Sequence, residues 1–176
     1  MSSDNAPTNS NVPSNNDHPN ATLPTKGRLG GIDFGTVRIG VAISDPGQSI
    51  ASPLTTYQRR TRELDAKFFD KIAKEERLAG WVVGLPVHMS GDPSEKSREA
   101  IAFGTWLEEQ TGVTVAWIDE RFSTAMAREI LSQSNLSGKK RKAQLDKLAA
   151  QILLTAFLER QSNSGSASTP TSLFDE

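Results

Sequence analysis

The sequence predicts an α/β domain with a mixed central sheet of about five strands, flanked by helices. Two patterns support this prediction. Three apolar runs of strand length follow one another before any helical pattern, and two more such runs alternate with helical patterns. Successive strands favour antiparallel pairing, whereas strands that alternate with helices favour parallel pairing, so one sheet is expected to contain both.

The first three strands are expected to form an antiparallel meander. They cover residues 28–34, 39–43 and about 49–55. Gly35 and Thr36 turn the chain between the first two strands, and the Asp-Pro-Gly run at 45–47 is a turn signal before the third. Pro53 has no N–H group to donate to a neighbouring strand, which places the third strand toward a sheet edge.

Helices and two further strands make up the rest of the domain. Helices are expected at about 61–77, at 94–110, from a cap at Ser123 through Leu131, and at about 143–160, with strands at 81–85 and 113–118. Leu64, Phe68 and Ile72 form an apolar stripe with i, i+4 spacing in the first helix. Gly112 ends the second helix, and the basic run 138–142 is interpreted as a loop before the last one.

Composition divides the chain into one domain, 27–160, and two tails. Residues 1–26 are rich in Asn, Ser and Pro, and residues 161–176 in Ser and Thr. Both tails are expected to be disordered, because they offer little apolar surface for burial. The chain has no cysteine, no secretory signal and no apolar run near the roughly 18 residues of a membrane helix, so a soluble cytoplasmic protein is expected.

Three acidic residues occupy positions that a structural role explains poorly. Asp33 ends the first apolar run, Glu120 ends another, and Asp146 lies on the apolar side of the last helix. At 100° per residue, Asp146 falls between Leu153 and Phe157. Acids that face a core are rare unless they are paired or bind a metal. If the three meet, they form an oxygen site for Mg²⁺ or Mn²⁺, which indicates phosphodiester chemistry.

Each acid also has a structural alternative. Asp33 could cap a hairpin turn, although the small residues after it let backbone N–H groups approach a phosphate. Asp119 and Glu120 are adjacent, and only one can face the site because side chains alternate along a strand. Asp146 could complement the helix dipole at the start of its helix.

Basic side chains could contact a nucleic-acid partner. All 20 Lys and Arg residues lie between positions 26 and 160, whereas four of the 21 acids lie in the tails, so the domain is weakly basic. Arg38 and Arg121 could offset phosphate charge. The basic runs 59–62 and 139–142 could attract phosphates in a salt-dependent way, but a solvated surface explains both runs equally well.

Four blocks of the sequence resemble the YqgF/RuvX family. They are Asp33-Phe34-Gly35-Thr36-Val37-Arg38-Ile39-Gly40-Val41-Ala42, Gly84-Leu85-Pro86, Asp119-Glu120-Arg121-Phe122-Ser123-Thr124 and Asp146-Lys147-Leu148-Ala149-Ala150. The blocks occur in the family's order and at its spacing, and they cover about residues 27–160. Each block alone is weak, whereas the four together are specific. Val37 and Phe122 replace side chains that are commoner in the family.

The resemblance implies an RNase H-like fold, related to Holliday-junction resolvases, and a nuclease that processes the 5′ end of pre-16S ribosomal RNA in the bacterial cytoplasm. Ribosomal precursor particles are then expected partners. The implied catalytic and metal-binding residues are Asp33, Glu120 and Asp146. The residues expected to contact the substrate are Thr36, Arg38, Arg121, Ser123, Thr124, Lys139 and Lys140.

Three alternatives stand beside this hypothesis. A Holliday-junction resolvase would cut branched DNA with two symmetric active sites, so a homodimer would favour it and a monomer would favour the RNA role. A non-catalytic binding module would act by contact alone. An actin-like or sugar-kinase-type ATP-binding domain shares the strand-end Asp-x-Gly-Thr hairpin, but it normally needs a second copy and two lobes.

Overall fold

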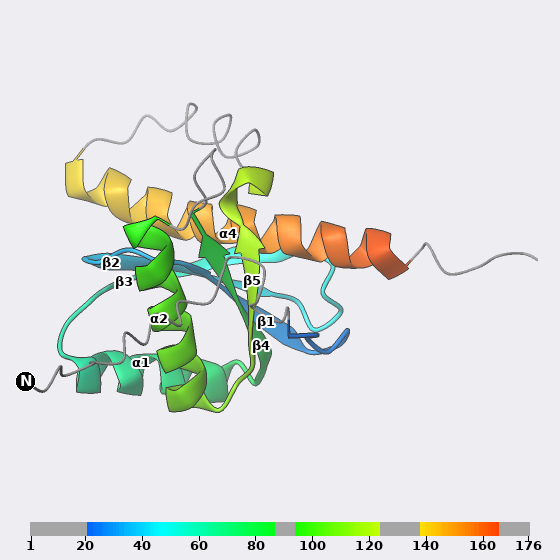
Figure 1. Ribbon diagram of the computed structural model, residues 1–176, viewed down its shortest axis with the longest axis horizontal. Coiled ribbons are helices and arrows are strands. Elements are labelled where there is room, and N and C mark those ends of the chain that lie inside the picture. The colour runs from blue at the N-terminus through cyan, green and yellow to red at the C-terminus, as the bar shows by residue number, and fades with distance from the viewer. Residues whose placement is uncertain (1–20, 87–93, 124–137, 166–176) are drawn as a thin grey trace, which may run out of the picture.

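The computed structural model describes residues 21–86, 94–123 and 138–165. Within these ranges a five-stranded sheet has helices on both faces (Figure 1). The strands are β1 (Arg28–Asp33), β2 (Arg38–Ser44), β3 (Ala51–Gln58), β4 (Leu78–Leu85) and β5 (Val115–Asp119). The helices are α1 (Arg62–Glu75), α2 (Glu95–Thr111) and α4 (Gly138–Gly165), with a short 3₁₀ helix, η1 (Glu120–Ser123). The prediction of a mixed sheet flanked by helices is confirmed.

The strand order is β3-β2-β1-β4-β5. β1, β2 and β3 pair antiparallel, whereas β4 pairs parallel with both β1 and β5. The predicted meander is therefore present, and β3 lies at the sheet edge as its proline required. The register of the β2–β3 pair also shifts next to Pro53, which is typical of a β-bulge. Because β1, β4 and β5 are parallel, their carboxyl ends meet at one edge of the sheet.

Each face of the sheet has its own hydrophobic core. The face covered by α1 and α2 buries Ile32, Val41, Trp81 and Val83 against Phe69, Phe103, Trp106 and Leu107. The face crossed by α4 buries Leu29, Ala42, Val82 and Ile118 against Ala150, Leu153 and Leu154. Figure 1 shows α4 crossing the sheet on the opposite side from α1 and α2. Strand residues alternate between the two cores, as the pleat requires.

Helix α4 approaches the sheet closely over β1 and β2, where glycines leave room for it. A Cβ atom at Gly31 would lie 2.8 Å from the Cβ of Leu154. A Cβ atom at Gly40 would overlap the main-chain oxygen of Asp146. Any larger residue at position 40 would therefore push this part of α4 away from β2.

The prediction of a loop at 138–142 is wrong, because α4 begins at Gly138 rather than near residue 143. The reason is that Lys and Arg are good helix formers, so a basic run can extend a helix without any apolar periodicity. Asp146 consequently lies beyond the first turn, where the helix dipole acts only weakly. The dipole alternative for Asp146 is therefore wrong as well.

The described chain also extends past the predicted domain limits. Leu23, which was assigned to the N-terminal tail, is 3% exposed and packs in the core beneath α4. At the other end α4 continues to Gly165, beyond residue 160. The predicted helix after Ser123 falls on residues 124–137, outside the described ranges. None of the helices in the described ranges has the length and apolar character needed to cross a bilayer.

The substitution Gly40→Ala is expected to destabilise the domain, because the added methyl group overlaps the main chain of Asp146. Overpacking of this kind costs about 1–3 kcal/mol. Urea unfolding followed by circular dichroism would measure the change. Gly47→Ala is the control, because a methyl group there meets side-chain oxygens and no main chain, with Oδ2 of Asp45 at 3.0 Å and Oγ of Ser49 at 3.6 Å. Equal losses in the two variants would contradict the close approach of α4.

Candidate active site

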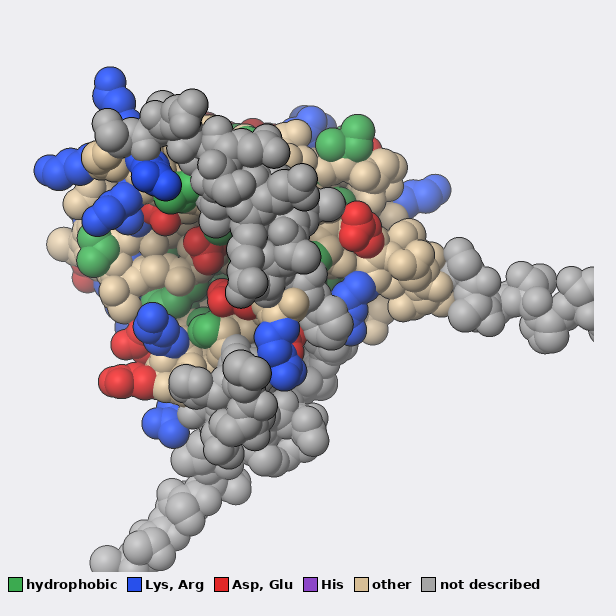
Figure 2. Space-filling view, turned by 90° about the horizontal axis from the view of Figure 1, so that it is seen from above, with side chains coloured by type: hydrophobic (Ala, Val, Ile, Leu, Met, Phe, Trp, Pro, Cys, Tyr) green, Lys and Arg blue, Asp and Glu red, His purple; other side chains and the backbone are tan. Residues whose placement is uncertain are grey.

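The candidate active site lies at the sheet edge where β1, β4 and β5 end. Asp33 is the last residue of β1, Pro86 follows β4 and Glu120 follows β5. A hollow of about 360 Å³ opens there, and Asp33, Thr36, Pro86 and Glu120 line it. Figure 2 looks onto this edge and shows acidic side chains near the middle of the face, with Lys and Arg side chains on either side.

Asp33 has a strongly perturbed protonation equilibrium. Its burial, and then the negative charges of Glu120 and Asp146, raise the pKa of Asp33 from 3.8 to about 7. Carboxylates shift one another's pKa in this way only when they lie close together in a poorly solvated place. The structure thus brings the three predicted acids from distant segments into one electrostatic cluster.

Of the two adjacent acids, Glu120 is the one turned toward this cluster. A Cβ atom at Gly84 would lie 3.2 Å from Oε1 of Glu120, so this side chain folds over the end of β4. Burial raises the pKa of Glu120, the charge of Asp119 adds to the effect, and Lys96 opposes it. Ile118 packs in the core beneath α4, and strand alternation carries Glu120, two residues later, to the same face.

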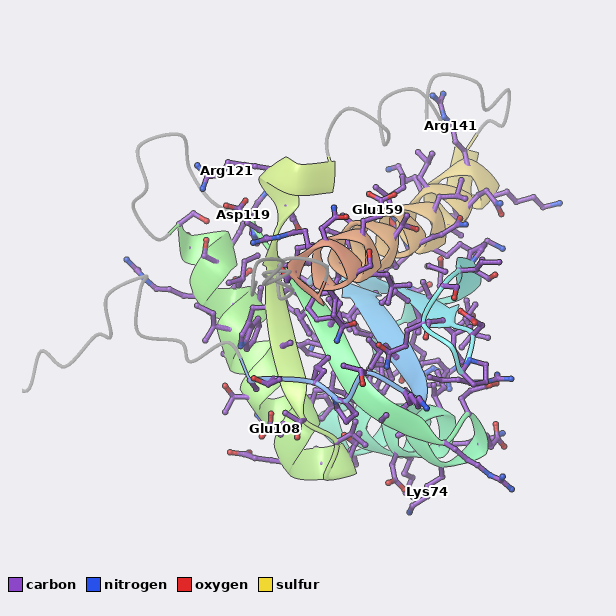
Figure 3. All side chains as sticks on the ribbon, turned by 90° about the vertical axis from the view of Figure 1, so that its right-hand side faces the viewer. Lys74, Glu108, Asp119, Arg121, Arg141 and Glu159 are labelled. Carbon is purple, nitrogen blue, oxygen red and sulfur yellow. The ribbon has the colours of Figure 1, made fainter. Side chains whose placement is uncertain are left out.

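Asp119 is engaged with Arg121 instead. Its Oδ1 accepts a hydrogen bond from the main-chain N–H of Arg121 at 2.9 Å, and its Oδ2 accepts one from Nε at 2.8 Å. Figure 3 shows the two side chains beside each other at the end of β5. Burial acts to raise the pKa of Asp119, but the hydrogen bonds and charge of Arg121 outweigh burial and hold that pKa below its usual value.

Asp146 reaches the cluster from α4 and is held by Arg38. The Nε of Arg38 donates to Oδ2 of Asp146 at 2.7 Å, and the two side chains are 32% and 24% exposed. Arg38 is the first residue of β2, so this ion pair joins the helix to the β1–β2 hairpin. Asp33 and Glu120 line the hollow itself, whereas Asp146 lies next to it, close enough to repel Asp33.

The donor set suits a hard divalent cation in its chemistry, since carboxylate oxygens are the ligands that Mg²⁺ prefers. In the described part of the chain, however, no three such side chains are already arranged as a metal-binding group. The ion pair with Arg38 contributes to this, because it turns one oxygen of Asp146 to a guanidinium. Burial first, and then the charges of Glu120 and Asp146, disfavour a charged Asp33, and a bound cation would offset both effects.

The other predicted contact residues are distributed around the site. Thr36 lines the hollow and is exposed, whereas Arg38 and Arg121 each hold an acid. Lys139 and Lys140 are exposed in the first turn of α4. Ser123 ends η1, but its side chain lies outside what the structure describes, as does Thr124.

Sequence reasoning missed two charged residues that line the hollow, Lys96 and Glu99 of α2. Both are exposed and sit three residues apart, on the same helix face as Phe103. Their spacing from Phe103 was the signal that could have found them. It was not used, because charged residues near the start of a helix usually contact only solvent. Only the placement of α2 beside the end of β1 gives these two residues a role.

Comparison with known proteins identifies the family. Residues 27–160 match the model of a family described as RuvX, Holliday junction resolvase. A Rhodopirellula baltica protein named “Putative pre-16S rRNA nuclease” is 49% identical over 137 residues, which cover 78% of this chain and 79% of that protein. A Rhodobacter capsulatus protein of the same name is 39% identical over 147 residues, which cover 84% of this chain and 92% of that protein.

Among solved structures, the one titled “T. thermophilus RuvC in complex with Holliday junction substrate” matches with a TM-score of 0.50 at 13% identity, covering 77% of this chain and 97% of that chain. At that identity the match concerns the fold alone, and it confirms the predicted RNase H-like architecture. The family match and the relatives confirm the predicted nuclease class and favour it over the two-lobed ATP-binding alternative. The chain belongs to the RuvX family of Holliday junction resolvases.

Proposed function

We propose that this nuclease is a metal-dependent endonuclease whose site is built from Asp33, Glu120 and Asp146, and that it acts on the 5′ end of pre-16S ribosomal RNA. The observation that carries the proposal is the electrostatic cluster of the three acids at one sheet edge. Acids with a purely structural role would lower the stability of the fold by repelling one another. Acids that bind cations must lie close together, so their repulsion is expected in a metal site.

Asp33 has the central role in this proposal, with Glu120 and Asp146 on either side of it. Divalent cations bound there would supply an activated water and stabilise the charge on the leaving oxygen. Arg38 positions Asp146 through the 2.7 Å ion pair. Lys96 lines the hollow and offsets part of the charge of Glu120, so it is placed to contact a phosphate oxygen.

Basic residues around the hollow are proposed to bind the rest of the substrate. Lys139 and Lys140 are exposed on the first turn of α4 and can contact phosphates without losing a partner described here. Arg38 and Arg121 would each contact a phosphate only by sharing or giving up the acid that they hold. Thr36 offers a hydroxyl group at the mouth of the hollow.

The names of the relatives favour RNA as the substrate, whereas the family description and the RuvC likeness make branched DNA the second candidate. A junction resolvase needs two symmetric sites, and therefore a dimer. The proposal commits to the RNA role in the cytoplasm, on ribosomal precursor particles.

The first prediction concerns the three acids. Asp33→Asn, Glu120→Gln and Asp146→Asn are each expected to reduce Mg²⁺-dependent cleavage of a labelled pre-16S 5′ fragment by more than the roughly 10- to 100-fold that follows loss of a residue supporting a metal ligand. Asp119→Asn is the control, because Asp119 is occupied by Arg121, and a smaller loss is expected. Undiminished cleavage by Asp33→Asn and Asp146→Asn would reject the assignment.

The second prediction concerns pH and stability without metal. The folded-state pKa of Asp33, about 7, lies above the unfolded value of 3.8, so its contribution to stability is full below pH 3.8 and is lost as pH rises through 7. Each pKa unit corresponds to about 1.4 kcal/mol before solvent screening. Asp33→Asn in EDTA is therefore expected to raise the Tm by several degrees at pH 8, and less at pH 5.

Asp119→Asn is expected to change the Tm in the opposite direction in the same measurement. The pKa of Asp119 is lowered in the folded state, so its contribution is present above the unfolded pKa and is lost as pH falls. This variant is expected to melt below the wild type at pH 8. Parallel pH profiles for the Asp33 and Asp119 variants would contradict the proposed charge cluster.

The third prediction separates the two substrates. With equal concentrations of a pre-16S 5′ fragment and a synthetic four-way junction, the wild-type protein is expected to cleave the RNA faster in Mg²⁺. Sedimentation under the assay conditions would show whether the active species is a monomer. Symmetric cleavage of the junction by a dimer, with the RNA left intact, would assign the DNA role instead.

A further inference from the structure

A second hollow adjoins the candidate active site and is rich in arginine. Its volume is about 520 Å³, and Arg59, Arg60 and Arg62 line it. Phe34, Thr36 and Glu99 line both this hollow and the one that holds Asp33, so the two hollows are neighbours that share this wall. We name the second hollow, with its three arginines, the arginine groove.

Arg59 is fixed in the arginine groove by a buried acid. Its Nε donates to Oδ2 of Asp65 at 3.3 Å, and Asp65 is 1% exposed. The same carboxylate accepts hydrogen bonds from the Tyr57 hydroxyl at 2.8 Å and from the main-chain N–H of Arg60 at 2.9 Å. Burial and the bond to Asp65 raise the pKa of Tyr57 to about 12, so this hydroxyl remains a donor.

Aromatic rings form the floor beneath two of the guanidinium groups. The Cζ of Arg59 lies 5.5 Å from the ring centre of Phe34 and 5.7 Å from that of Phe103. The Cζ of Arg62 lies 5.6 Å from the ring centre of Trp106. Contacts of this kind favour a cation over a ring face and restrict where the guanidinium can move. Two of the three guanidinium groups, those of Arg59 and Arg62, are therefore oriented by the rings beneath them.

Two of the three arginines keep their charge available. Asp65 balances Arg59, but no ion pair of Arg60 or Arg62 occurs among the residues that the structure describes. A planar guanidinium has paired N–H donors that match the oxygens of a phosphate. Phe103 and Trp106 are only 5% and 7% exposed, so they support the arginines and are not free to stack on a base. These features fit a ligand recognised by phosphate groups and not by bases.

We propose that the arginine groove binds phosphates of the nucleic-acid strand that flank the bond cleaved at Asp33. This inference rests on the proposed nuclease site, because only a strand held there must continue into the neighbouring hollow. Successive phosphates of a single strand repeat at short intervals, so a strand that leaves the first hollow past Thr36 brings its next phosphates to Arg60 and Arg62. The negative charge of Glu99, at the shared wall, repels the phosphates of the strand and lowers the affinity.

Binding is tested separately from cleavage. In an Asp33→Asn background, which prevents cleavage, fluorescence anisotropy would measure the affinity for a labelled single-stranded pre-16S 5′ fragment at several salt concentrations. Adding Arg60→Gln and Arg62→Gln removes two proposed contacts, so the slope of log K against log salt is expected to fall by about 1.4. The affinity at low salt is expected to fall by roughly tenfold.

The control variant carries Lys71→Gln and Lys74→Gln in the same background. It removes the same number of positive charges, but from the end of α1 opposite to Arg62, and Figure 3 places Lys74 at the opposite end of the molecule from Asp119 and Arg121. Its salt slope is expected to match that of the parent. Glu99→Gln is expected to increase the affinity several-fold. Melting curves of all variants would verify that they fold.

The possible outcomes test the proposed phosphate binding by the arginine groove separately from the proposed nuclease activity. An unchanged affinity and salt slope for the double arginine variant would overturn the groove, even if the wild type cleaves RNA normally. Reduced binding by that variant, with no cleavage of any nucleic acid by the wild type, would support the groove and reject the proposed function. Displacement of the RNA by polyglutamate at equal charge concentration would identify an acidic protein partner and also overturn the proposal.

When cleavage is present, steady-state kinetics give a further check. The Arg60→Gln, Arg62→Gln variant with Asp33 intact is expected to raise KM by roughly tenfold, the same factor as its binding loss, while kcat changes by less than about threefold. A loss confined to kcat would place these arginines in the chemical step and contradict a role in holding the flanking strand.

Discussion

The close crossing of α4 over β2 at Gly40 is the constraint on which the candidate site depends. Asp33 and Glu120 come from strand ends, which the sheet aligns by itself, but Asp146 comes from a separate helix. The charge of Asp146 acts on Asp33, and this close approach of α4 needs position 40 to have no side chain that would hold the helix away. Packing farther along the helix maintains this approach, with Leu153, Leu154 and Leu158 all at most 6% exposed.

The same packing explains how the fold tolerates repelling charges. A fully buried leucine contributes about 1.5–3 kcal/mol, so the three leucines of α4 together contribute about 5–9 kcal/mol. The shift of the Asp33 pKa from 3.8 to about 7 costs at most about 4 kcal/mol at high pH. The buried leucines therefore outweigh the cost of a charged Asp33, which comes first from its own burial and then from Glu120 and Asp146.

Elements whose residues carry a local physical signature could be predicted from the sequence. Pro53 placed β3 at an edge because proline lacks an N–H group, and Gly112 ended α2 because that position has a positive φ of 66°. Asp146 could be placed toward the sheet because its neighbours on the helix are apolar. The resemblance of the four blocks then connected three acids that local patterns left separate.

Features that depend on where one element lies relative to another could not be predicted. A basic run such as 139–142 has no apolar periodicity, so it did not show that α4 begins at Gly138. The choice between Asp119 and Glu120 depended on which face of the sheet α4 covers, which strand alternation alone does not show. Lys96 and Glu99 looked like ordinary surface residues, because their relation to Asp33 exists only in three dimensions.

The helical state of the basic run changes how its charges can act. In a loop, Lys139 and Lys140 could reach a polyanion over a wide volume, but they would lose conformational entropy on binding it. On α4, Lys139 lies seven residues before Asp146, about 10 Å along a stiff rod at 1.5 Å per residue. The start of α4 thus fixes the distance along the helix between the basic residues at its tip and the carboxylate of Asp146.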